Sequence, residues 1–308
     1  MLTNTDAYNN KTAKTAPKLI FIIPYRNRSQ HMNFFKVMMK HVLEDYSEGS
    51  YEFCFAHQCD PRPFNRGAMK NLGFIAMKEK YPNDYKNITF VFNDVDTVPY
   101  TKNVLHYETQ PGIIKHFYGY SFALGGILAI NGADFERING FPSYWSWGFE
   151  DNCLQNRALK AGLVIDRSNF FKIGNYNILQ MTDGYGRMVN RRGPHQLGHD
   201  DGKDGISTIR SIHYQMNGDM ANFTSFEPIH KMDDEMFEKF DLSNRKFLTN
   251  NIEQWNMRHQ ASSGGKNTNT PMIPVSSVPP GSQLQPKLIP KGSQHPRLSL
   301  RNMFNTRS

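Results

Sequence analysis

The sequence predicts an α/β fold with a mixed, mainly parallel sheet flanked by helices. Short apolar runs alternate with segments whose apolar residues recur at helical spacing. The chain has 308 residues, of which 38% are hydrophobic, so a sizeable core is possible. We expect one domain over 18–260, a flexible leader over 1–17 and a disordered tail over 261–308.

The first half of the chain supplies three strands and two helices in alternation. Strands are expected over 18–24, 51–56 and 88–93, where apolar residues form short runs. Ser29 and Asn65 can each cap a helix that follows a strand. Because ligands of parallel sheets gather beyond the carboxyl ends of the strands, the segments after these strands are the first candidates for a site.

The second half of the chain differs in composition. Glycines and aromatic residues dominate 119–148, and a helix is expected over 150–161. Short strands are expected over 163–166 and 206–214, the latter being the final strand. Residues 174–205 are glycine-rich and polar, which predicts a long functional loop.

The net charge of +8 is concentrated in the tail. Residues 261–308 hold six of the 36 basic residues and no acidic ones, which leaves 30 basic against 28 acidic residues elsewhere. The folded part is therefore nearly neutral, and we expect no specific nucleic-acid partner. Binding of polyanions by the tail itself stays open as a minor alternative.

No targeting or membrane-spanning segment is visible in the sequence. The N-terminal residues 1–16 are polar, and the longest early apolar run, 19–23, is too short to cross a bilayer. We therefore expect no membrane span and a soluble chain, cytoplasmic by default, with the compartment itself left open.

The most informative stretch is Phe-Val-Phe-Asn-Asp-Val-Asp at 90–96, where an apolar run ends in Asp94 and Asp96. On a continuing strand both carboxylates would point to one side, roughly 6.5–7 Å apart. Two such acids can hold a hard divalent cation that keeps positions open for phosphate oxygens. The pattern is typical of a nucleotide-sugar transferase, although Asp-x-Asp alone also fits an ordinary polar turn.

Arg26 and Arg28 follow the first strand in the segment Pro-Tyr-Arg-Asn-Arg. Guanidinium groups at this spacing can hold a uracil edge or a diphosphate through bidentate hydrogen bonds. A solvated pair of loop charges is the simpler alternative.

A second basic cluster opens the helix after Asn65. Arg66 and Lys70 lie one helical turn apart, at a helix start whose N–H groups favour an anion. An amphipathic helix with a polar first turn is the alternative.

The third cluster is the aromatic stretch 138–151, which contains Trp145 and Trp147 and ends in Glu150 and Asp151. Indole rings can stack on sugar rings, and paired acids can do acid–base chemistry. The same aromatics could instead be core, and acids at a helix start also stabilise the helix.

These clusters, in this order, resemble the β-1,4-galactosyltransferase family over about residues 18–215. Further elements of the likeness are Gly125-Gly126, Asn139-Gly140-Phe141-Pro142 and Asp204-Gly205-Ile206. The resemblance implies a GT-A fold and inverting transfer from a UDP-sugar with Mn²⁺, or Mg²⁺, as cofactor. A glycan or glycoconjugate would be the acceptor.

The resemblance also implies roles for individual residues. Asp151 would be the general base, Glu150 would bind an acceptor hydroxyl, and Asp96 would bind the metal. The implied donor-binding residues are Pro24, Arg26, Arg28, Arg66, Asp94, Val95, Gly125, Gly126 and Trp147.

Three departures from the family pattern bear on function. The Met-x-x-His of the family is replaced by Gln-Met-Thr-Asp-Gly, so Asp183 is the expected further metal ligand, with His195 or His199 as alternatives. Ala123 leaves room for an N-acetyl group, so the sugar is expected to be a hexose or an N-acetylhexosamine. Phe149 replaces a glycine, which would stiffen the loop.

The missing histidine leaves a second hypothesis open, namely that the chain is a catalytically inactive sugar- or nucleotide-sugar-binding module.

Overall fold

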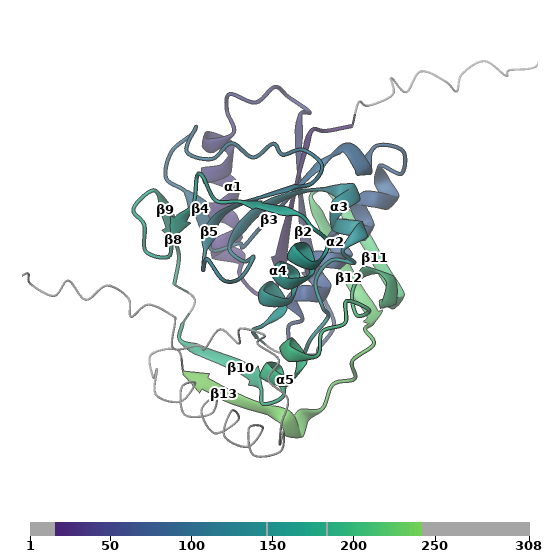
Figure 1. Ribbon diagram of the computed structural model, residues 1–308. Coiled ribbons are helices and arrows are strands. Elements are labelled where there is room, and N and C mark those ends of the chain that lie inside the picture. The colour runs from purple at the N-terminus through teal and green to yellow at the C-terminus, as the bar shows by residue number, and fades with distance from the viewer. Residues whose placement is uncertain (1–15, 146, 183, 242–308) are drawn as a thin grey trace, which may run out of the picture.

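A nine-stranded mixed sheet forms the centre of the computed structural model, which describes residues 16–145, 147–182 and 184–241 (Figure 1). The strand order is β11-β12-β2-β1-β3-β6-β5-β7, and β8 pairs with β5. In chain order these strands are β1 (Leu19–Tyr25), β2 (Tyr51–Gln58), β3 (Thr89–Asn93), β5 (Ile113–Gly119), β6 (Ile127–Asn131), β7 (Val164–Asp166), β8 (Phe171–Lys172), β11 (Arg210–Asn217) and β12 (Met220–Glu227).

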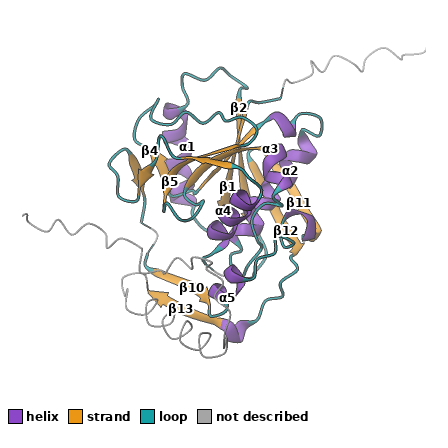
Figure 2. Cartoon of the chain, in the orientation of Figure 1, coloured by secondary structure: helices purple, strands orange, loops and turns teal. Residues whose placement is uncertain are grey.

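Helices and two small ribbons surround this sheet (Figure 2). The helices are α1 (Ser29–Val42), α2 (Arg66–Lys80), α3 (Gly132–Arg137), α4 (Glu150–Lys160) and α5 (Gly193–Gly198). Short 3₁₀ turns lie at η1 (Tyr85–Asn87), η2 (Ile206–Thr208) and η3 (Asp234–Met236). The antiparallel ribbons pair β4 (Thr97–Pro99) with β9 (Ile178–Gln180) and β10 (Gly186–Asn190) with β13 (Phe237–Asp241).

The strand–helix alternation predicted for the first half is confirmed. β1 pairs in parallel with both β2 and β3, which places the carboxyl ends of all three strands at one edge. β6 then runs antiparallel to β3 and β5, so the sheet is mixed. We did not predict β5 or β6. Lys115 and His116 interrupt the apolar residues of β5, and β6 lies within the glycine- and aromatic-rich stretch 119–148.

The two faces of the sheet build two apolar cores. Along β1, Leu19, Phe21 and Ile23 pack on the α1 side, whereas Ile20 and Ile22 pack under α2. All five side chains are fully buried. This explains why β1 reads as a continuous apolar run rather than as an alternating one.

The two predicted helix caps have different outcomes. The Asn65 side chain accepts a 2.9 Å hydrogen bond from the Ala68 backbone N–H and caps α2, as predicted. Ser29 is instead the first residue of α1, whose N-cap is Arg28 with no side-chain cap bond. The prediction of a Ser29 cap is therefore wrong.

The long loop predicted over 174–205 contains β9, β10 and α5. These elements are short, and β9 and β10 pair with partners far along the chain, so local periodicity does not reveal them. The strand predicted over 206–214 begins at Arg210 instead, after η2. It is not the last strand, since β12 and β13 follow.

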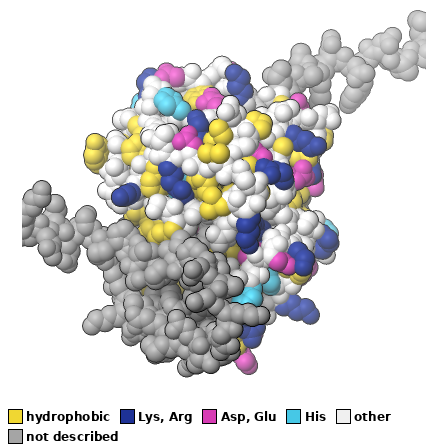
Figure 3. Space-filling view, in the orientation of Figure 1, with side chains coloured by type: hydrophobic (Ala, Val, Ile, Leu, Met, Phe, Trp, Pro, Cys, Tyr) yellow, Lys and Arg dark blue, Asp and Glu magenta, His cyan; other side chains and the backbone are white. Residues whose placement is uncertain are grey.

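The ends of the domain are only partly described. Ala16, which we assigned to the leader, already packs against the core beneath α2, while 1–15 and the predicted tail over 261–308 lie outside the described residues. Within the described part, no helix is long and apolar enough to cross a membrane. On the face shown in Figure 3, Lys and Arg side chains are interspersed with Asp and Glu.

Candidate active site

Asp94 and Asp96 lie in a turn rather than on a strand. β3 ends at Asn93, whose side-chain amide donates 2.8 Å hydrogen bonds to the carbonyls of Asp94 and Thr97. Asp94 is buried, whereas Asp96 is half-buried and accepts a 2.9 Å bond from the Thr97 hydroxyl. The expectation that strand alternation aligns the two carboxylates is therefore wrong, because the turn fixes their directions.

Arg66, the first residue of α2, links the two acidic clusters. Its guanidinium lies 2.8 Å from Asp94 Oδ2 and 3.9 Å from Glu150 Oε1. The positive charge of Arg66, which we expected to attract a bound anion, is thus paired with two carboxylates of the protein itself. The other oxygen of Asp94, Oδ1, is buried with no hydrogen-bond partner among the described residues.

The glycine pair lies between the Asp94 turn and the start of α4. The Asp94 backbone N–H donates to the Gly126 carbonyl over 3.1 Å, and the Leu124 N–H donates to the Asp151 carbonyl over 3.0 Å. Gly126 has φ 73°, and an added Cβ would overlap the Tyr118 carbonyl. Only glycine suits this position. The segment 124–126 therefore bonds to both the aspartate turn and the start of α4.

Glu150 and Asp151 open α4 but differ in their surroundings. Glu150 is buried, and burial raises its pKa, helped by the nearby Asp151 charge and opposed by Lys70 and Arg66. The Asp151 side chain is more exposed, and its Oδ1 accepts a 2.7 Å hydrogen bond from the Lys70 ammonium.

The clustered charges are unbalanced. Arg66 pairs with Asp94 and Glu150, and Lys70 pairs with Asp151, so these ion pairs set two cations against the four carboxylates Asp94, Asp96, Glu150 and Asp151. Four carboxylates against two cations leave a formal charge of −2 when all are ionised. Burial also raises the pKa of Asp94, because a carboxyl group removed from water is less easily ionised. Oxygen donors with excess negative charge, one of them lacking a partner, fit a hard divalent cation.

The residues predicted to bind the donor at the ends of β1 and β3 lie at the same edge of the sheet. Pro24 is buried within β1, and the half-buried Arg26 side chain donates to the Arg62 carbonyl. Val95 is buried in the core beside α1, so only its backbone could contact a ligand. Arg28 is half-buried at the start of α1.

The two tryptophans have separate roles. Trp145 is buried, stacks on Phe226 and donates a 2.8 Å hydrogen bond to the His230 carbonyl, so it belongs to the core. Trp147 is exposed, and its backbone N–H donates to the Met188 carbonyl of β10 over 2.8 Å. Of these two tryptophans, Trp147 is the one whose ring is exposed enough to stack on a sugar.

Phe149 adopts the backbone conformation of a glycine, with φ 70°. Its ring lies against Gly193 at the start of α5, where an added Cβ would lie 2.7 Å from a ring carbon. A bulky residue in this region of φ is strained. The packing of the ring on Gly193 helps to hold it there.

A further metal ligand is not identified among the described residues, where no three His, Cys, Asp or Glu side chains form a group suited to a metal. Asp183 lies outside the described residues. The chain does approach Asp96 here, because the Met181 N–H donates to the Asp96 carbonyl over 2.7 Å. His195 of α5 stacks on His199, the residue that follows the helix, with ring centroids 3.9 Å apart.

The 139–143 segment is fixed by α2 and by Asp204. The Asn71 side chain makes both hydrogen bonds of the Phe141 backbone, at 2.7 and 2.9 Å. Asp204 Oδ2 accepts a 2.7 Å bond from the Ser143 N–H, and Ile206 N–H donates to Asn139 over 3.1 Å. The segments 139–143 and 204–206, which are distant in the sequence, are thus bonded to each other.

His116 is a supporting residue that the sequence did not single out. Arg167 Nε donates to His116 Nδ1 over 3.0 Å, so Nε2 carries the proton and donates to the carbonyls of Gly125 and Tyr118 at 3.0 and 3.1 Å. Arg167 is held in turn by Gln155 of α4. The available signal was a histidine beside Lys115 in the otherwise apolar and aromatic run 113–118.

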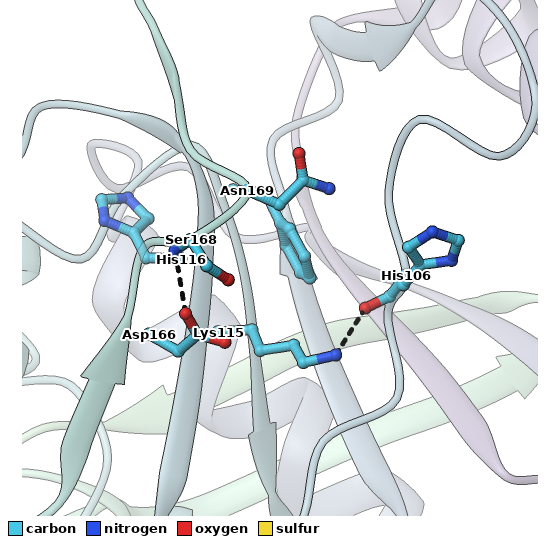
Figure 4. A pocket seen from close by; sticks show the side chains of 7 residues that line it. His106, Lys115, His116, Asp166, Ser168 and Asn169 are labelled. Atoms are coloured by element: carbon cyan, nitrogen blue, oxygen red, sulfur yellow. Dashed lines mark hydrogen bonds between the residues drawn. The ribbon is translucent and has the colours of Figure 1, made fainter.

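A cavity of 110 Å³ is lined by Lys115, His116 and Phe117 of β5 together with residues near β7 (Figure 4). Its polar groups satisfy one another: Lys115 Nζ donates to the His106 carbonyl over 3.0 Å, and Ser168 N–H donates to Asp166 over 2.8 Å. A cavity of this size is too small for a nucleotide sugar. This cavity is therefore not the candidate donor site.

Two family models match the chain. The N-terminal region of glycosyl transferase group 7 matches residues 1–108, and the N-terminal domain of galactosyltransferase matches residues 114–182. Together they span more than half of the chain and include the acidic clusters, both arginines after β1 and the glycine pair.

Curated relatives agree with these matches. The chain is 32% identical to β-1,4-galactosyltransferase 1 of Mus musculus over 171 residues, and 32% identical to β-1,4-galactosyltransferase 2 of Cricetulus griseus over 186 residues. The matches span 53% and 56% of this chain, but 42% and 48% of the two relatives. The chain thus matches less than half the length of these proteins.

The catalytic domain of Drosophila β-1,4-galactosyltransferase 7, solved with xylobiose, matches with a TM-score of 0.54 and 22% identity, over 68% of this chain and 94% of that chain. A mutant of that protein, solved with manganese, UDP-Gal and xylobiose, matches with the same TM-score at 20% identity. These likenesses confirm the GT-A fold. By its motifs, its family matches and its fold, this chain belongs to the β-1,4-galactosyltransferase family.

Proposed function

We propose that this chain is an inverting, metal-dependent glycosyltransferase that moves a hexose or an N-acetylhexosamine from a UDP-sugar to a sugar hydroxyl. The observation that carries the proposal is the meeting of two acidic clusters at Gly125 and Gly126. Asp94 donates to Gly126 through its backbone, while the side chain of Asp151 lies against Gly125. A cation-binding turn and a candidate base thus flank one point of the fold.

The donor would lie along the carboxyl edge of β1 and β3. Arg26 and Arg28 would hold the uridine diphosphate, and Asp96 would bind Mn²⁺ or Mg²⁺. A bound divalent cation would offset the negative charge that builds on the leaving diphosphate. Arg66 is neutralised by Asp94, so its main role would be to orient that carboxylate beside the donor.

The transfer itself would be a single displacement. The acceptor hydroxyl oxygen forms a bond to the anomeric carbon as the bond from that carbon to the diphosphate oxygen breaks, and UDP leaves with the electron pair. Asp151 takes the hydroxyl proton, while Glu150 orients the acceptor. Attack from the face opposite UDP inverts the anomeric centre.

One residue of this chain and one solved neighbour bear on the class of sugar and of acceptor. Ala123 is small and lies two residues before Gly125, which supports a donor site with room for an N-acetyl group. The Drosophila neighbour has been solved with UDP-Gal and xylobiose, which supports a UDP-hexose donor and a glycan acceptor.

The test is a screen of UDP-sugars with Mn²⁺ that follows UDP release and the sugar product, with and without simple sugar acceptors. We expect acceptor-dependent UDP release that needs the divalent cation, and a product of inverted anomeric configuration. Mn²⁺-dependent UDP binding with no release on any acceptor would favour the inactive binding module. A product with retained configuration would exclude the single displacement.

A further inference from the structure

Lys70 is an unusual residue for its position, because it is a lysine in the interior of the fold. It lies on the second turn of α2 with only 1% of its surface exposed. A buried ammonium is costly unless it is paired. Its partner is Asp151, which lies 81 residues further along the chain and accepts its hydrogen bond at 2.7 Å.

The pairing uses one oxygen of Asp151 and leaves the other directed elsewhere. Oδ1 accepts from Lys70, whereas Oδ2 is the atom that an added Cβ on Gly125 would meet first. The Asp151 carboxylate is therefore fixed in rotation, with Oδ2 at the glycine pair. That is the point where the donor-side turn of Asp94 is bonded to Gly126.

The surroundings explain why a cation is needed there. Asp151 lies beside Glu150 and near Asp94, so like charges repel its carboxylate. Lys70 is the cation that contacts Asp151 directly, and its ammonium also lies 4.3 Å from the Phe141 ring centroid. Phe141 is itself held at both backbone groups by Asn71, the next residue of α2. The position of the Lys70 ammonium is thus fixed by its packing and its hydrogen bond.

We propose that Lys70 is a positioning residue for catalysis, which holds Oδ1 of Asp151 so that Oδ2 is the oxygen that takes the acceptor proton. This inference rests on the proposed transferase function. The proton moves from the acceptor hydroxyl to Oδ2, while Lys70 keeps its own protons and its bond to Oδ1. A carboxylate free to rotate would populate this geometry less often and lower the rate.

The experiment compares Lys70→Met with Lys78→Met, each in the wild-type and in the Asp151→Asn background. Methionine keeps much of the apolar stem and removes the charge. Lys78 is the matched control, because it lies on the same helix and pairs with Glu136, which is outside the site. The readouts are kcat, the KM for the UDP-sugar, and Mn²⁺-dependent binding of UDP.

In the wild-type background, Lys70→Met is expected to lower kcat by about 10- to 100-fold with little change in donor KM or UDP binding, as for a misplaced reacting group. In the Asp151→Asn background it should lower kcat no further, because the base it positions is already gone. Lys78→Met should match its parent in both backgrounds.

Three results would overturn the inference. Lys70→Met could retain the wild-type kcat, it could lower kcat equally in both backgrounds, or it could lose UDP binding together with activity. The last two would show a structural role instead. If Lys70→Met fails to fold, the same measurements are made on Lys70→Gln, which keeps an N–H donor without the charge. If the unmodified chain transfers no sugar, the proposed function fails first, and that result is separate from these.

Discussion

Gly125 and Asp151 are packed so closely that an added Cβ on Gly125 would lie 2.8 Å from the carboxyl carbon of Asp151. The carboxylate occupies the space that any other side chain at position 125 would need. The glycine is required here by the neighbour and not by the backbone, because Gly125 does not have a positive φ. The identity of one residue thus fixes the place of the other.

Gly125→Ala is therefore expected to displace Asp151 and to lower sugar transfer by about 100-fold, as expected for a reacting group moved by roughly 1 Å. Steady-state kinetics of UDP release would measure this. Gly186→Ala is the matched control, because Gly186 lacks a positive φ and has open space around its Cβ position. A Gly125→Ala variant with unchanged kcat would show that Asp151 need not lie where the structure has it.

Asp96→Ala is expected to weaken Mn²⁺-dependent binding of UDP by at least about tenfold, because a carboxylate ligand is lost from a hard-cation site. Titration calorimetry of UDP with and without Mn²⁺ gives the measurement. Asp201→Ala serves as the control, since Asp201 is exposed and pairs with Lys203. Equal Mn²⁺ dependence in the Asp96 variant and the parent would remove Asp96 from the metal site.

The stability of the fold should depend on pH through His116. Burial, followed by the charge of Arg167, lowers the pKa of His116 to about 4 from the usual 6.5. Above the usual value both states are neutral, and below it only the unfolded chain gains the proton. The free energy of unfolding therefore falls as the pH drops from 6.5 towards 4, by roughly 2–3 kcal/mol from this residue.

His116→Gln removes this titration. Denaturant unfolding of both chains near neutral pH and near pH 4.5 would compare the acid-induced loss of stability, and we expect the variant to lose roughly 2–3 kcal/mol less than the parent. Acidic side chains that titrate in the same range contribute equally to both chains. An identical loss in the two chains would mean that His116 is not held neutral.

The sequence named the residues of the candidate site but not the contacts between them. Short motifs identified Asp96 and Asp151 because their residue types and spacing are local properties of the chain. The bond between Lys70 and Asp151 joins residues 81 positions apart, so no periodicity could show it. The same holds for His116, whose partner Arg167 lies 51 positions further along the chain, in the segment after β7.

The missed strands have a similar cause. β5 and β6 are held by tertiary pairing and end in glycines and polar residues, so their local pattern is weak. The expected alignment of Asp94 and Asp96 failed because Asn93 ends the strand and builds a turn with its side chain. Side-chain bonds of this kind change the direction of a chain without changing its hydrophobic pattern.

The most direct test of the account is the rate of sugar transfer by Asp151→Asn, measured together with its Mn²⁺-dependent affinity for UDP. A positioned general base contributes on the order of 10²–10⁴-fold, so we predict a loss of that size in kcat with UDP affinity nearly unchanged. Transfer at the parent rate would contradict the assignment of Asp151 as the base and, with it, the single site formed around the glycine pair.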